Sequence, residues 1–486
     1  MSEKPGIQAL NDPARLHSRY NPQGEAARYI DSLNLTDNIK VFILIEPGLG
    51  YVIPLLREKF KESKIIVLHA ENIQGPFEQG LPVLNSEDAN EIQKFLETQI
   101  PETGAKNIRI IEWRPSMNFY KEAYVNILSQ VVNFIKRIEA GKRTTAVFGK
   151  RWVQNFFKNL ELVNKTLLYK ETEIPVIITG SGPSLEKALP VIKKAQDSCL
   201  IIAASSSVTA LSSFGIKTDI IITTDGGTWA LKHMYSCYRN DNAPLAVNLC
   251  AALPSQFNDT PFLIINDGSF WQSIVLHELS LPSVIIPQKG TVTAAALELA
   301  LQLTKGNIYL AGMDLSAKDI RTHVKPYSFD ALLFAHANRF LPYYSESFTR
   351  SFLIHHGGSM EIYAQWFKKE LSSWPKRIFS ITESNVFERA DLLKENSASR
   401  SRNSRVKNKS DFFKTAQAKE KSAFFYKRET AVKAADALLN ALKNPEYADN
   451  IKQELASLLF EDGSNVQSAE LEEKIREIAF KKAIHE

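Results

Sequence analysis

Two turns rich in glycine and hydroxyl residues are the places where this chain could bind a phosphate group. The first follows the apolar run 176–179 and consists of Gly180, Ser181, Gly182, Pro183, Ser184 and Leu185. The second contains Gly290 and Thr291 and precedes an apolar helix predicted over 294–303. Glycines let the backbone approach a ligand closely, and the first N–H groups of a helix attract an anion. A plain chain reversal is the alternative interpretation of either turn.

Polar residues also follow two neighbouring apolar runs. Ser205 and Ser206 come shortly after the run 200–202, where small hydroxyl side chains could contact a nucleotide or cap the next helix. Asp225 comes directly after the run that ends at Thr224. A carboxylate at such a strand end could order a ribose, bind a cation or accept a proton.

A later apolar run, 307–311, ends in Gly312 and Asp314, and His323 follows in a predicted loop. Histidine is the side chain best suited to exchange protons near neutral pH. A single loop histidine is often only a surface residue, but this one directly follows a candidate site segment. We therefore take His323 as the first candidate for a catalytic base, with Asp225 and Asp314 next.

A parallel sheet is the element that must position these residues. Helical spacers separate most of the apolar runs of the central region, as a doubly wound sheet requires. These runs are 174–179, 199–204, 219–224, 245–249, 262–266, 283–287 and 307–311. Because ligands of such sheets collect at the carboxyl ends of the strands, we expect both turns to face one pocket.

A segment nearer the N-terminus has the sequence pattern of a second, smaller dinucleotide-binding domain. The apolar run 40–45 leads into Gly48 and Gly50, and an acidic residue, Glu71, follows the next run. This spacing could hold a ribose. Val52 stands where a third glycine is expected, so we interpret the segment as a Rossmann-like domain without a cofactor site.

The predicted fold class is α/β, with two Rossmann-like parallel-sheet domains followed by a C-terminal α-helical domain. Five regions follow from composition and periodicity. They are an N-terminal Rossmann-like domain at 1–115, a helical bridge at 116–170, a central α/β domain with the candidate site residues at 171–390, a basic linker at 391–411 and about three amphipathic helices within 412–486.

Composition narrows the function classes. The 486 residues are 44% hydrophobic and 23% charged, with a net charge of +5, which is a modest basic excess for a nucleic-acid-binding protein. Three widely spaced cysteines exclude a disulfide framework. We expect a cytoplasmic protein, because neither a signal peptide nor a membrane span is recognisable. No structural metal cluster, Walker loop or nucleophile elbow is found either.

In order along the chain, these motifs resemble the motility-associated factor (Maf) family of bacterial flagellin glycosyltransferases. The resemblance covers most of residues 18–385, and further segments that carry it are 18–22, 46–51, Trp366-Phe367 and 381–383. Family patterns often have Gln where Met313 stands and Ala where Val324 stands. The resemblance implies a central domain similar to bacterial sialyltransferases, whose Gly-x-Gly-Pro-Ser-Leu turn binds the cytidine monophosphate (CMP) part of the donor.

The resemblance further implies a CMP-activated nonulosonic acid of the pseudaminic or legionaminic type as donor, and a flagellin serine or threonine as acceptor. No cofactor, metal, nucleic acid or membrane is expected to take part. We expect the nucleotide to bind at the turn 180–185, at Ser205 and Ser206, and at Gly290, Thr291 and Gly312.

Two other hypotheses about the function stay open. The central domain is also similar to an archaeal pterin pyrophosphokinase, in which ATP with Mg²⁺ would make Asp219 and Asp225 metal ligands. Alternatively, the chain is a non-catalytic flagellin-binding protein that docks through its C-terminal helices.

Overall fold

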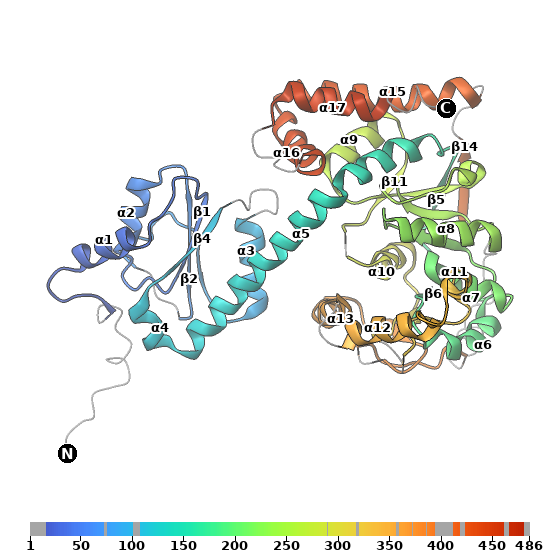
Figure 1. The fold of residues 1–486 in the computed structure, drawn as a ribbon, viewed down its shortest axis with the longest axis horizontal. Coiled ribbons are helices and arrows are strands. Elements are labelled where there is room, and N and C mark those ends of the chain that lie inside the picture. The colour runs from blue at the N-terminus through green and yellow to red at the C-terminus, as the bar shows by residue number, and fades with distance from the viewer. Residues whose placement is uncertain are drawn as a thin grey trace, which may run out of the picture. The chain divides into compact units, whose positions relative to one another are not determined.

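The computed structural model describes residues 16–71, 75–100, 107–288, 290–316, 320–355, 359–371, 373–384, 386–393, 412–417, 423–460 and 466–480. The chain divides into two compact units, 1–147 and 148–486, and helix α5 (Glu122–Leu160) belongs to both (Figure 1). Of the predicted basic linker 391–411, all but its first three residues lie outside the described residues.

In the described part of the first unit, four parallel strands form a sheet in the order β3-β2-β1-β4. The strands are β1 (Val41–Ile45), β2 (Lys64–His69), β3 (Val83–Asn85) and β4 (Ile108–Glu112). The helices are α1 (Pro22–Ser32), α2 (Val52–Lys59), α3 (Ala89–Gln99), α4 (Arg114–Tyr120) and the first part of α5. Alternate residues of β1 enter two separate cores, Phe42 with α1 and α2 and Ile43 with α3 and α5. Helices on both faces explain why β1 is apolar throughout.

The glycine turn after β1 is filled by a side chain of the same unit. His17 Nε2 accepts a hydrogen bond from the Leu49 N–H at 2.8 Å, and its ring packs against Tyr51 and Trp113. A β-carbon on Gly48 would lie 2.4 Å from that nitrogen. The imidazole therefore occupies the space through which a phosphate would approach this turn.

A buried ionisable cluster joins the carboxyl ends of β1 and β2. His69 Nδ1 lies 3.0 Å from Glu46 Oε2, and its Nε2 lies 3.0 Å from Glu78 Oε1, with all three side chains buried. Glu46 also accepts hydrogen bonds from the Ala70 N–H and, through its main-chain oxygen, from the Ser116 hydroxyl. Burial by itself lowers the pKa of His69, but the bonds to the two carboxylates outweigh it and raise the pKa to about 9.

We predict that the first unit loses stability as pH rises from about 6.5 towards 9. A histidine whose pKa is higher in the folded than in the unfolded state binds its proton more tightly in the fold. This tighter binding stabilises the fold fully when the pH is below the unfolded-state pKa, and the stabilisation is lost as the pH rises through the folded-state pKa. At about 1.4 kcal/mol per pKa unit, the contribution of His69 is on the order of 3 kcal/mol. Hydrogen exchange of the β1 and β2 amides in the whole chain, corrected for the intrinsic pH dependence of exchange, measures this loss of stability.

His69→Gln should remove this loss between pH 6.5 and 9 and lower protection at neutral pH. The same substitution at His277, which is exposed on a helix of the second unit, is the matched control. Protection that stays constant between pH 6.5 and 9 in the wild-type chain would contradict a charged His69.

Among the described residues of the second unit, ten strands form one sheet. They are β5 (Lys165–Tyr169), β6 (Val176–Thr179), β7 (Leu200–Ala204), β8 (Ile220–Thr223), β9 (Leu245–Asn248), β10 (Phe262–Asn266), β11 (Ser283–Ile285), β12 (Ile308–Ala311), β13 (Ile378–Ser380) and β14 (Phe413–Gln417). Their order is β13-β12-β6-β7-β8-β9-β10-β5-β14, with β11 also paired to β10. All pairs are parallel except β5 with β14. The predicted α/β class is confirmed.

Helices cover both faces of this sheet. The described helices of this unit are α6 (Leu185–Ala195), α7 (Val208–Ser213), α8 (Thr228–Asn240), α9 (Phe270–Glu278), α10 (Val292–Leu303), α11 (Asp330–His336), α12 (Tyr343–His355), α13 (Ser359–Glu370), α15 (Ala423–Leu442), α16 (Ala448–Leu459) and α17 (Ser468–Phe480), with 3-10 turns at Ser205–Ser207 and Ser255–Asp259. Ile177 and Ile201 pack with α6 to α9, whereas Ile178 and Ile202 pack with α10. The alternation places α6 and α10, the helices that follow the two turns, on opposite faces.

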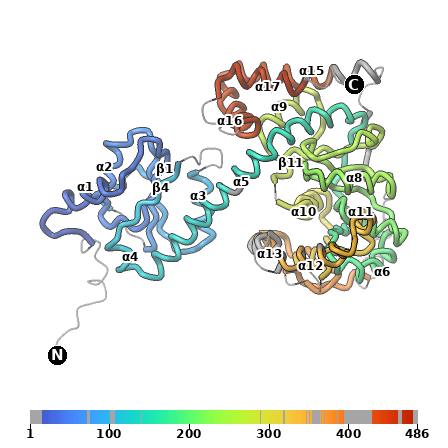
Figure 2. Tube along the Cα trace, in the orientation of Figure 1, coloured from blue at the N-terminus to red at the C-terminus, as the bar shows by residue number. Residues whose placement is uncertain are grey.

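The structure departs from the predicted pattern at two strands near one edge of the sheet. Residues 165–169 form β5 within the region predicted as a helical bridge, and β14 precedes the C-terminal helices. Both are peripheral and pair with each other antiparallel. Beyond them α15, α16 and α17 form, and α15 and α16 pack on α9 (Figure 1), so that the chain returns to a helix far earlier in sequence (Figure 2).

Candidate functional site

The strand order reverses between β6 and β12. From β6 the chain continues to β7 on one side, whereas β12 and then β13 lie on the other side of β6. Ligands of open parallel sheets bind outside the carboxyl ends of the strands at such a switch point. The turn 180–184 follows β6 and the turn 312–315 follows β12, so the sheet brings both predicted segments to this position.

The two turns are bonded directly to each other. The Gly180 N–H donates to Ala311 O and the Gly182 N–H donates to Gly312 O, both at 2.8 Å. A β-carbon on Gly182 would lie 1.9 Å from Asp314 Oδ2, and one on Gly312 would lie 2.4 Å from Gly180 O. Glycine is required at both positions because the backbones approach too closely for any side chain.

Asp314 lies at the start of α6. Its carboxylate accepts hydrogen bonds from the Ser184 N–H at 3.2 and 3.3 Å and from the Ser184 hydroxyl at 3.0 Å. The Thr382 hydroxyl, after β13, donates to Ser184 Oγ at 3.2 Å. Three neighbouring strand ends therefore meet at Ser184. The charge of Asp314 takes the place at the N-terminus of α6 where an anion would bind.

The loop that carries His323 is fastened onto the first turn. The Val324 N–H donates to Ser181 O at 2.8 Å, and the Lys325 N–H donates to Glu186 Oε1 at 3.1 Å. Arg321 forms a salt bridge with Glu186 Oε2 at 3.2 Å. These contacts hold His323 beside the predicted phosphate turn.

His323 itself is partly buried and has defined neighbours. Its Nδ1 lies 2.8 Å from Thr322 Oγ1. Its ring stacks on that of Tyr327, with centroids 4.2 Å apart and an interplanar angle of 19°. The imidazole is thus held in one orientation at the edge of the site.

The start of α10 reaches the same place from the other face of the sheet. Thr291 caps the helix by accepting a hydrogen bond from the Ala294 N–H at 3.1 Å. A β-carbon on Gly180 would lie 3.2 Å from the methyl carbon of Thr293. The second predicted turn therefore adjoins the first.

Tyr363, from α13, lies against the second turn. A β-carbon on Gly290, where φ is +74°, would lie 3.1 Å from the Tyr363 ring. Burial raises the pKa of the Tyr363 hydroxyl, and the negative charge of Asp225 raises it further. Asp225 is exposed and accepts a hydrogen bond from the Gly227 N–H at 2.7 Å. Asp225 lies just past the carboxyl end of β8, at the edge of the sheet to which both turns also belong.

The two serines after β7 differ in how far they are exposed to solvent. Ser205 is buried and Ser206 is only partly exposed. The neighbouring Ser207 hydroxyl binds Thr179 Oγ1 at 2.8 Å, which joins the ends of β6 and β7. Of the two serines assigned to the nucleotide, Ser206 is the more accessible.

Asp219 and Asp225 lie at opposite ends of β8. Asp219 Oδ2 accepts a hydrogen bond from the Ile201 N–H at 2.8 Å, at the amino end of the strand. The four residues of β8 between them span roughly 13 Å. These two carboxylates therefore lie too far apart to bind one Mg²⁺ ion together, and the assignment of both as ligands of an ATP–Mg²⁺ site stays a prediction. Within the described residues, no histidine, cysteine and acidic side chains are grouped to hold a metal.

Sequence reasoning missed Glu186, Tyr327 and Tyr363. Glu186 stands in the first turn of α6, where an acidic residue is usually explained by the helix dipole. Tyr363 gave no signal because its contact with Gly290 joins segments that are distant in sequence. Tyr327 gave none because its stacking on His323, four residues away, depends on the conformation of an irregular loop.

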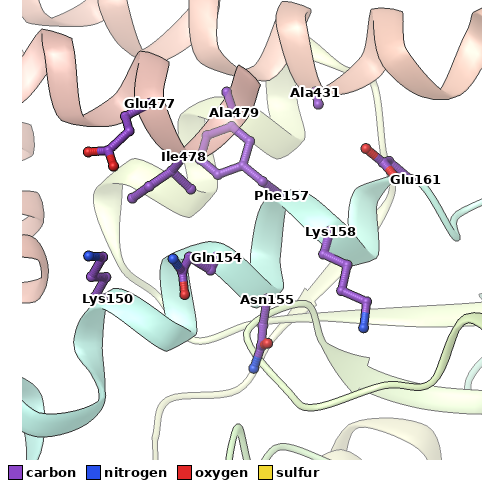
Figure 3. Close-up of a pocket in the computed structure, with 10 residues that line it drawn as sticks. All are labelled: Lys150, Gln154, Asn155, Phe157, Lys158, Glu161, Ala431, Glu477, Ile478 and Ala479. Atoms are coloured by element: carbon purple, nitrogen blue, oxygen red, sulfur yellow. The ribbon is translucent and has the colours of Figure 1, made fainter. Parts of the chain in front are cut away.

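A cavity of about 470 Å³ opens between α5 and the helices α15 and α17 (Figure 3). Its lining residues are Lys150, Gln154, Asn155, Phe157, Lys158, Glu161, Ala431, Glu477, Ile478 and Ala479. None of the predicted site residues lines it. Asn155 donates hydrogen bonds to Gly226 O and Cys250 O at 3.3 and 3.0 Å, which makes it a support of the Asp225 turn.

Part of the chain matches a known family model. Residues 150–319 match the family model of 6-hydroxymethylpterin diphosphokinase MptE-like proteins. This MptE-like region runs from the end of α5 past β12, so it contains both turns, Asp225 and Asp314.

Similarity to individual proteins extends over more of the chain. Two uncharacterized proteins of Treponema pallidum (strain Nichols) are 28% and 26% identical over 57% and 43% of this chain. The matches span 61% and 37% of those relatives. The fold is also that of a MAf glycosyltransferase from Magnetospirillum magneticum AMB-1, with a TM-score of 0.52, 14% identity, and coverage of 99% of this chain and 79% of that one. The described helices include none that is long and apolar enough to cross a bilayer.

Proposed function

We propose that the chain is a glycosyltransferase that moves a nonulosonic acid of the pseudaminic or legionaminic type from a CMP-activated donor to serine or threonine of flagellin in the cytoplasm. The observation that carries the proposal is the joining of the β6 and β12 turns under the His323 loop. The shared fold with a MAf glycosyltransferase supports it.

The reaction breaks the bond between the anomeric carbon of the sugar and the phosphate oxygen. The bonding electrons leave with CMP, while positive charge develops on the sugar ring. The acceptor hydroxyl oxygen then bonds to the anomeric carbon, and its proton passes to a base. We assign this base to His323, because the loop contacts hold it beside the turn after β6. Asp225 and Asp314 are the next candidates.

The leaving phosphate needs hydrogen-bond donors that are already in place. Since Asp314 lies at the start of α6, we assign the phosphate to the backbone of residues 290–293 at the start of α10, next to Gly180. The first intrahelical bond there is from the Ala295 N–H to Thr291 O, and Thr291 Oγ1 accepts from the Ala294 N–H. The N–H groups before Ala294 are therefore the ones that need partners from outside the helix. The turn 180–185, Ser205, Ser206 and Gly312 would border the nucleoside. No metal is needed for this arrangement.

Intact-mass analysis of flagellin from cells with and without the protein tests the proposal. We expect a mass increment of a nine-carbon acidic sugar at one or more sites, and the same increment when purified chain, CMP-activated sugar and flagellin are combined. Flagellin that binds the chain and keeps its mass would favour the non-catalytic binding protein.

The MptE-like match favours a second candidate, a pterin diphosphokinase that uses ATP and Mg²⁺. A thermal-shift series separates the two, because a ligand at 100 times its dissociation constant stabilises the folded state by about 2.7 kcal/mol. We expect CMP to raise the melting temperature without Mg²⁺. Stabilisation by ATP only with Mg²⁺, and none by CMP, would favour the kinase. Adenosylmethionine tests the first unit, where His17 fills the glycine turn.

A further inference from the structure

Three aromatic side chains connect α8 to the candidate base. His233 of α8 lies with its Nδ1 2.5 Å from Ser328 Oγ and its Nε2 3.2 Å from the Tyr327 hydroxyl. The Phe329 ring also stacks on the His233 ring, with centroids 4.4 Å apart and an interplanar angle of 29°. Tyr327 in turn stacks on His323. A continuous chain of contacts therefore runs from the helix to the imidazole.

His233 is suited to hold a hydroxyl rather than to carry charge. Burial lowers its pKa to about 4, so the ring is neutral at neutral pH. A neutral imidazole has one donor and one acceptor nitrogen, and a hydroxyl can serve either of them. The two hydroxyls of Ser328 and Tyr327 therefore satisfy both ring nitrogens, which fixes the phenol of Tyr327.

The fixed phenol restricts His323. The Tyr327 ring is buried and lies nearly parallel to the imidazole, at an angle of 19°. Rotation of the imidazole about its side-chain bonds would break this stacking. A small displacement of a catalytic group costs much of the rate, because the base must meet the acceptor proton in one geometry.

We propose that Tyr327 and His233 are positioning residues that hold His323 in the orientation for proton transfer. The inference rests on the proposed function, in which His323 is the base. Tyr327 acts by stacking, and His233 acts one step further away by holding the Tyr327 hydroxyl.

Variants at Tyr327 separate stacking from the hydroxyl contact. Tyr327→Leu removes the ring, and we expect kcat to fall by about 10- to 100-fold with little change in KM for the acceptor or in CMP affinity. Tyr327→Phe keeps the ring and loses the hydroxyl, so we expect a fall of only several-fold. His233→Gln, which can still bond the hydroxyl, should resemble wild type more closely than His233→Leu. Tyr235→Leu, at an exposed tyrosine of α8, is the matched control.

An NMR measurement on the whole chain with labelled histidine needs no enzyme activity. The ring proton signals of His323, assigned by comparison with His323→Ala, should shift in Tyr327→Leu and stay near their wild-type position in Tyr327→Phe. If the wild-type chain had no transfer activity, the proposed function would be removed. The comparison of the His323 signals between Tyr327→Leu and Tyr327→Phe would still test whether Tyr327 positions His323. The inference is overturned if Tyr327→Leu leaves both kcat and the His323 signals unchanged, or if its melting temperature and CMP affinity collapse along with kcat.

Discussion

Replacing His323 with alanine is expected to lower the rate of sugar transfer by about 10²- to 10⁴-fold, while the chain keeps its fold and its affinity for CMP. The loop is held by the main chain of Val324 and Lys325 and by Arg321, and none of these contacts uses the imidazole. The substitution therefore removes the proton acceptor and leaves the turn in place. Transfer to flagellin is followed by mass, and CMP binding by thermal shift.

His336→Ala is the matched control, because His336 is an exposed histidine on α11. It should leave both the rate and CMP binding unchanged. Full transfer activity in the His323→Ala chain would remove His323 from the role of base and move attention to Asp225, which is exposed just past the carboxyl end of β8.

The sequence was sufficient to predict that the site residues collect at one edge of a sheet. The apolar runs that were expected at 199–204 and 307–311 form β7 (Leu200–Ala204) and β12 (Ile308–Ala311). In a parallel sheet all carboxyl ends lie at one edge, so residues that follow such runs meet there. Asp225 and Asp314 were predictable for this reason.

The pairing between those residues could not be predicted in the same way. Which strands are neighbours depends on the return of the chain to β12 beside β6, and no local pattern specifies it. The contact of Asp314 with Ser184 spans 130 residues, and that of Lys325 with Glu186 spans 139. The type of side chain at a strand end indicates a candidate site. Which residue it contacts there is determined by the order of the strands in the sheet.

Asp314 changes the interpretation of the first glycine turn. A turn before a helix attracts an anion when the first N–H groups of the helix lack partners. Here the carboxylate of Asp314 already accepts from the Ser184 N–H. A phosphate at this turn would face a like charge at close range, which is unfavourable. Because of this repulsion, we assign the phosphate to the start of α10. The close contacts of Gly182 then serve to join the turns after β6 and β12.

Gly182→Ala tests that assignment, and we expect it to disrupt the joint between β6 and β12. The new β-carbon would lie 1.9 Å from Asp314 Oδ2 and 2.8 Å from Gly312 O. The carboxylate can rotate away and lose Ser184, but the carbonyl oxygen belongs to the backbone and accepts the Gly182 N–H. We expect a loss of about 1–3 kcal/mol in the free energy of unfolding and a fall in transfer rate on the order of 100-fold. Urea unfolding and the flagellin mass assay measure the two effects.

Gly141→Ala is the matched control. Gly141 lies within α5, and a β-carbon there would meet no heavy atom within 4 Å. Alanine in a helix interior is favoured over glycine by about 1 kcal/mol, so this variant should be at least as stable as wild type and equally active. A Gly182→Ala chain with unchanged unfolding and transfer would mean that the two turns are not in contact in solution. The site would then lack the joint that places His323 beside the donor.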